Sequence, residues 1–92
     1  MYDSPAGQAV RASLEDIAAT GTTPSREQLE RLTARVCQAT DELRSLGWPP
    51  ERVIVRLKEL SRETLPAGVD TPTRELVTGQ IVQSALQRYF GG

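Results

Sequence analysis

Hydrophobic residues recur every three or four positions along most of the chain, and this spacing predicts helices rather than strands. Proline, glycine and short polar runs divide the pattern into segments. The expected helices cover approximately residues 5–20, 24–46, 50–64 and 72–90. Since 92 residues suffice for one small domain, we expect residues 1–92 to form a single all-α domain, a small four-helix bundle.

The expected second helix has the most regular pattern. Its apolar residues are spaced three, four, three, four and three apart, which is the a/d seam of a helix packed lengthwise against its neighbours. These residues are Leu29, Leu32, Val36, Ala39, Leu43 and Leu46. The pattern fits a central core helix, and a dimerisation zipper is the alternative interpretation.

Serine or threonine followed by proline precedes three of the four helices. Such pairs are typical of a helix cap followed by the first helical residue. The segments TPSRE and TPTRE therefore predict caps at Thr23 and Thr71, with Glu27 and Glu75 in the first turns, where the helix dipole favours acidic residues.

The stretch LGWPP predicts a tight corner between the second and third helices. Gly47 can adopt the left-handed conformation that ends a helix in a Schellman motif, and Trp48 would then fold back against Leu43. Pro49 and Pro50 prevent the helix from continuing, and Pro50 suits the first turn of the next one. We expect a helix–turn–helix corner at Gly47-Trp48-Pro49-Pro50.

The chain offers little material for catalysis. It contains no histidine and one cysteine, so it cannot supply a histidine general base, a histidine or multi-cysteine zinc site, or an internal disulfide. No phosphate-cradling glycine loop is present. We therefore expect a protein that is not an enzyme, with no catalytic residue, no cofactor and no metal. Cys37 is interpreted as a small buried hydrophobic residue in a reducing compartment.

Charge and hydropathy argue against nucleic-acid-binding, secreted and membrane proteins. The formal net charge is −1, so no global field attracts the chain to nucleic acid or anionic lipid. The N-terminal sequence MYDSPAGQ has no signal-peptide character, and no apolar run reaches the ~18 residues that a membrane span needs. We expect a cytoplasmic protein without membrane association. The C-terminal pair Gly91-Gly92 is interpreted as the end of the last helix.

The bundle is expected to bury one set of apolar residues and to leave another set over. The predicted core consists of Leu14, Ile17, Leu29, Leu32, Val36, Leu43, Leu46, Trp48, Val53, Leu57, Leu60, Ile81 and Ala85. The remaining apolar residues are Ile54, Val55, Val82, Leu86 and Phe90. A small monomer has little reason to expose so many apolar side chains. The first hypothesis is therefore a regulatory or interaction module that binds another protein, or a second copy of itself, through this surface of helices three and four.

The corner also supports a second hypothesis. An apolar residue and a glycine end the helix, and apolar residues then recur at the offsets of helix-turn-helix segments: Leu46, Gly47, Trp48, Val53, Leu57 and Leu60. Residues 43–62 thus resemble the helix-turn-helix family of DNA-binding regulators. The resemblance implies DNA contacts by Arg44, Arg52, Arg56 and Lys58.

The two hypotheses differ in what the start of the third helix offers. Glu51 would repel phosphate, whereas Ile54 and Val55 suit a protein groove better than a base edge. The interaction module is therefore the first hypothesis, and the DNA-binding regulator is the alternative.

Overall fold

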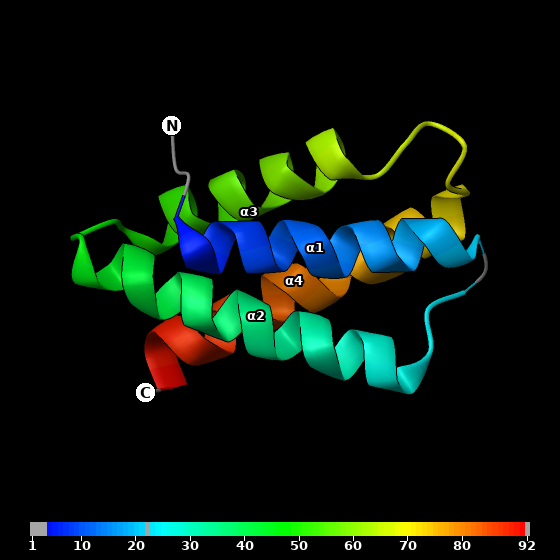
Figure 1. Ribbon diagram of the computed structural model, residues 1–92. Coiled ribbons are helices and arrows are strands. Elements are labelled where there is room, and N and C mark those ends of the chain that lie inside the picture. The colour runs from blue at the N-terminus through cyan, green and yellow to red at the C-terminus, as the bar shows by residue number, and fades with distance from the viewer. Residues whose placement is uncertain (1–3, 22, 92) are drawn as a thin grey trace.

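The computed structural model describes residues 4–21 and 23–91, which form an all-α bundle without strands (Figure 1). The predicted fold class is confirmed. The first and third helices have the expected bounds, the second begins two residues later and ends one earlier than expected, and the fourth extends one residue further at each end. The helices are α1 (Pro5–Thr20), α2 (Arg26–Ser45), α3 (Pro50–Thr64) and α4 (Thr71–Gly91). Gly91 is thus the last residue of α4, and Gly92 lies outside the described residues.

The helices are arranged with α1 and α4 on opposite sides of the core. Both α1 and α4 pack against α2 and α3, whereas no described residue of α1 approaches α4 within 8 Å between Cα atoms. Figure 1 shows the start of α1, the α2–α3 corner and the end of α4 at one end of the bundle. The other two connections lie at the opposite end.

The corner between α2 and α3 is the Schellman motif that the sequence predicts. The Trp48 N–H donates to the carbonyl of Leu43 at 3.1 Å, and the Gly47 N–H donates to the carbonyl of Arg44 at 3.0 Å. Gly47 has φ of 87°, a conformation that is costly for residues with a Cβ. The corner therefore depends on glycine at this position.

The cap of α2 differs from the prediction. Ser25, not Thr23, caps this helix, because its side chain accepts from the Gln28 N–H at 3.1 Å while the Gln28 side chain accepts from the Ser25 N–H at 2.9 Å. This reciprocal capping box satisfies two backbone donors at once, so it outcompetes a single threonine cap. Pro24 consequently precedes the helix and is buried.

The cap of α4 also differs from the prediction. The Asp70 carboxylate accepts from the Thr73 N–H at 3.1 Å, and Thr71 is the first helical residue rather than the cap. A carboxylate is favoured there because it accepts the hydrogen bond and also neutralises the positive end of the helix dipole. The hydrogen bonds from Thr73 lower the pKa of Asp70.

The core is formed by apolar residues of all four helices and of the α3–α4 loop. Its buried members are Val10, Leu14, Ile17, Leu32, Val36, Ala39, Leu43, Val53, Leu57, Leu60, Leu65, Val77, Ile81 and Ala85. Leu46 is a correction, because its side chain is 66% exposed. It is the C-cap residue of α2, where the chain leaves the helix and the heptad register no longer directs side chains inward. Leu29 and Trp48 are half-buried rather than buried.

The conformation of Gly47 generates a stability prediction. We expect Gly47→Ala to lower the free energy of unfolding by about 1–2 kcal/mol, because a Cβ disfavours the left-handed conformation. No atom lies within 4 Å of the position of the added Cβ, so the loss would be conformational rather than steric. Gly68→Ala is the matched control, since Gly68 has equal room and no positive φ. Equal urea midpoints for the two variants would contradict the prediction.

Candidate functional site

Large hydrophobic side chains are exposed mainly in the half of the bundle that contains the α2–α3 corner. Among the described residues, four of the five come from the end of α2, the first half of α3 or the end of α4. They are Leu46 (66% exposed), Val55 (56%), Leu86 (38%) and Phe90 (69%), with Leu76 (41%) near the start of α4. This half of the molecule is the candidate interaction surface.

The five residues predicted to bind a partner fall into two groups. Val55, Leu86 and Phe90 are exposed, whereas Ile54 and Val82 are half-buried. Ile54 packs against the core cluster, so it contributes to the bundle as well as to the surface. Intermediate burial is what residues at the edge of a helix–helix contact have, and the remaining three provide the accessible apolar area.

Three of the four aromatic residues of the chain gather beside this surface. The Tyr89 hydroxyl donates to the Trp48 carbonyl at 2.7 Å, which joins the end of α4 to the corner. The rings of Tyr89 and Phe90 contact edge to face, with centroids 5.2 Å apart. The guanidinium groups of Arg52 and Arg44 lie 4.6 Å and 5.5 Å from the ring centroids of Trp48 and Tyr89. We call these five residues the aromatic corner.

Sequence reasoning missed the aromatic corner as a unit. It placed Trp48 in the core and Phe90 on the surface, and it assigned no role to the Tyr89 hydroxyl. The available signal was the scarcity of aromatic residues. Three of only four lie in two segments, at residue 48 and at residues 89–90, which the bundle brings to the same end. Tyrosine at such a boundary usually directs its hydroxyl to a polar partner.

The basic residues of the DNA-binding alternative have different environments. Arg56 has a side chain that is only 12% exposed, and its guanidinium lies 3.7 Å from carboxylates of both Glu59 and Glu63. Arg44 and Arg52 stack on aromatic rings, and Lys58 is exposed. Three of these four basic residues therefore contact other side chains of the chain.

Polar side chains also join α4 to α2. Arg88 donates two hydrogen bonds to the Asp41 carboxylate, at 2.9 Å and 2.8 Å. About two turns nearer the start of α4, the Gln80 side-chain amide donates to the Thr33 hydroxyl at 2.7 Å. In this arrangement Val77, Ile81 and Ala85 of α4 are buried, whereas Leu86 is exposed.

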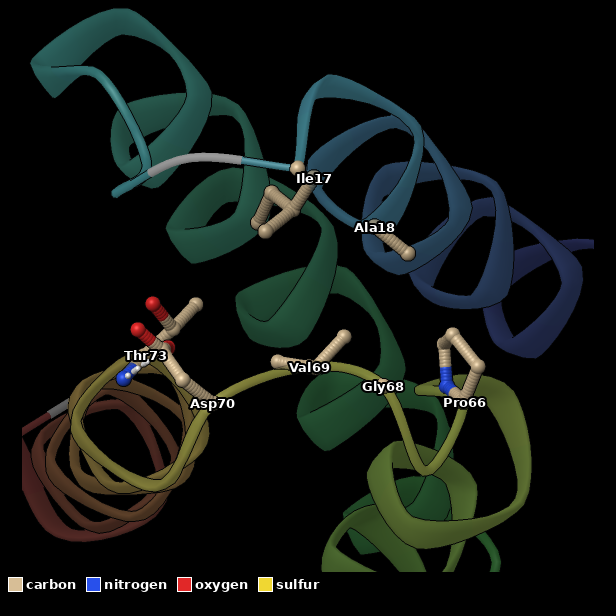
Figure 2. A pocket seen from close by; sticks show the side chains of 8 residues that line it. Ile17, Ala18, Pro66, Gly68, Val69, Asp70 and Thr73 are labelled. Atoms are coloured by element: carbon tan, nitrogen blue, oxygen red, sulfur yellow. Dashed lines mark hydrogen bonds between the residues drawn. The ribbon is translucent and has the colours of Figure 1, made fainter.

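The opposite end of the bundle has a small cavity of about 180 Å³ (Figure 2). Ile17 and Ala18 from the end of α1 face it across from Val69 of the α3–α4 loop. Its side-chain polar groups belong to Asp70 and Thr73, which already contact each other in the cap of α4. With these side chains engaged in the helix cap, the rest of the lining comes from apolar side chains and from backbone of Gly21, Pro66 and Gly68.

Other kinds of site find no support in the part of the chain that the structure describes. No group of three histidine, cysteine, aspartate or glutamate residues there could hold a metal ion. None of the four helices is both long and apolar enough to cross a membrane. Cys37 is half-buried, which is less burial than the sequence suggested.

No protein-family model, curated protein or solved structure matches the chain.

The contact between Asp41 and Arg88 generates a pH prediction. Hydrogen bonding from Arg88 lowers the pKa of Asp41 below its ordinary value of 3.8. A lowered pKa in the folded state means that the contact stabilises the protein above pH 3.8 and loses this effect as the pH falls below it. Asp41→Asn should therefore lower Tm modestly at neutral pH, since both side chains are nearly half exposed. The Tm difference from wild type should shrink toward pH 3, and a constant difference would contradict this assignment.

Proposed function

We propose that this protein is a non-enzymatic interaction or regulatory module that docks through the apolar surface of α3 and α4. The observation that carries the proposal is the exposure of Val55 and Leu86 together with Phe90 of the aromatic corner. Ile54 and Val82 form the half-buried base of this surface. The partner is another protein or a second copy of this chain.

The composition of the surface supports protein binding. Interface cores are enriched in aromatic residues and arginine and depleted in lysine and acidic residues. Arg52 on Trp48 and Arg44 on Tyr89 match this composition, and stacked guanidinium groups retain N–H donors for a partner. Burying an exposed side chain such as Phe90 contributes about 1.5–3 kcal/mol, so a few such residues suffice to drive association.

A double substitution tests the surface. Val55→Asp with Leu86→Asp should abolish retention of partner proteins when the tagged chain is incubated with an extract of the cells that produce it, because two carboxylates would have to be desolvated in the interface. Both side chains are exposed in the bundle, so far-UV circular dichroism should be unchanged. The matched control is Ala12→Asp with Ala34→Asp, which adds the same charge at exposed positions of α1 and α2. Equal retention by the two double variants would refute the proposal.

Duplex DNA tests the alternative function. We expect no binding at low salt, because Arg56 is engaged with two carboxylates and the net charge is −1. Fluorescence anisotropy with a labelled duplex measures this directly. Binding that weakens steeply with added salt, and that is lost in Arg52→Ala with Lys58→Ala, would instead favour the helix-turn-helix regulator.

A further inference from the structure

The outer face of α4 carries a second apolar seam that the bundle does not use. Its members are spaced three, four, three and four residues apart, the interval of a helix packed lengthwise against another helix. They are Leu76, Gly79, Gln83, Leu86 and Phe90, and all five are exposed. We call them the α4 seam. The inner face of α4 is separate and already fills the core with Val77, Ile81 and Ala85.

Gly79 is the member of the α4 seam whose residue type the structure of the single chain does not require. It lies in the interior of a helix, where glycine is less favourable than alanine. It has no positive φ, and no atom lies within 4 Å of the place where a Cβ would be. Neither the backbone nor the packing of the bundle therefore requires glycine. A missing side chain at a seam position does, however, leave room for a large side chain of an approaching helix.

From this pattern we infer that the α4 seam pairs with the α4 seam of a second copy, antiparallel and about a two-fold axis at Gln83. This inference rests on the proposed function and names the partner. In that arrangement Leu86 of each copy fills the space beside Gly79 of the other, and Phe90 of each copy packs on Leu76 of the other. The residue sizes are thus complementary when the seam is reversed against itself.

Electrostatics agree with a second copy as the occupant. The α4 seam contains no charged residue, so its burial desolvates no charge and places no like charges together. The central Gln83 would meet its own counterpart, and an amide can both donate to and accept from an identical amide. A single polar pair within an apolar seam fixes the register of helix pairing.

The charges on α3 also suit this reversed pairing. The outer residues of α3 include Glu51 at one end and Lys58 and Arg62 toward the other, with Val55 between them, all exposed. They recur at intervals of four, three and four, so they share one face of the helix. A two-fold axis across α4 keeps the α3 helices of both copies on the same side and reverses their direction. Glu51 of one copy then faces the basic end of α3 of the other.

This geometry requires that α3 run antiparallel beside α4, and two contacts establish it. The Tyr89 hydroxyl near the end of α4 bonds the Trp48 carbonyl just before α3. Near the other end, Arg74 of α4 donates to the Pro66 carbonyl just after α3, at 2.6 Å. The α3 face therefore flanks the α4 seam along its length and would extend the interface.

Gly79→Leu distinguishes size-matched pairing of the α4 seam from nonspecific hydrophobic association. Leucine is a strong helix former and has open space here, so the folded monomer should be at least as stable as wild type. Sedimentation equilibrium over roughly a hundredfold range of concentration should show a reversible dimer for wild type and at least ~10-fold weaker association for Gly79→Leu. Equal or tighter association of the variant would overturn the inference, because added apolar area would then help rather than clash.

Oxidative cross-linking tests the position of the two-fold axis. In a Cys37→Ser background, Gln83→Cys places one thiol on the proposed axis, and the two thiols of a dimer should form a disulfide readily. Gln38→Cys, at an exposed position of α2, is the matched control and should cross-link only slowly. Equal rates for the two variants would overturn the proposed geometry.

The inference and the proposed function fail in different ways. A wild-type chain that remains monomeric throughout the concentration range refutes pairing with a second copy. If that monomer still retains a partner from the cell extract, and Val55→Asp with Leu86→Asp loses it, the docking surface stands with a different protein as its occupant. If Val55→Asp with Leu86→Asp dimerises and retains partners as wild type does, the docking surface itself is refuted.

Discussion

The positive φ of Gly47 is the constraint on which the half of the molecule with the candidate interaction surface depends. It ends α2 and turns the chain within a few residues so that α3 can start at Pro50. The same turn presents the Trp48 carbonyl to the Tyr89 hydroxyl, and this hydrogen bond joins the end of α4 to the corner. A side chain at this position would therefore disturb the placement of the aromatic corner as well as the stability of the turn.

Apolar burial and polar contacts together hold α4 in its observed orientation. This helix has apolar residues around much of its circumference, so hydrophobic burial alone leaves its rotation poorly specified. Hydrogen bonds from Arg88 to Asp41 and from Gln80 to Thr33 form in the same rotation that buries Val77, Ile81 and Ala85. The rotation that buries Ile81 leaves Leu86 and Phe90 in solvent, and this exposure is the physical basis of the proposed docking surface.

The polar groups of the bundle are engaged mainly in contacts within the chain. Several of its carboxylates and arginines take part in helix caps, in ion pairs at helix surfaces and in stacking on aromatic rings. The cavity between α1 and the start of α4 has its side-chain polar groups engaged in a helix cap. The exposed apolar residues of α4 recur at helix-pairing intervals, and this pattern is the basis of the proposed pairing.

The local features of this protein were readable from its sequence, because they depend on residues three or four positions apart. Helix number, the Schellman corner and most core residues belong to this class, as does the surplus of Val55, Leu86 and Phe90. The caps of α2 and α4 are local as well, since each joins residues three positions apart, but the sequence offers competing caps there. Only the tertiary structure decided how α4 lies against α2 and that Tyr89 binds the corner. These outcomes depend on where one helix lies against another, a relation set by contacts between residues more than forty positions apart, for which a linear pattern holds no distance information.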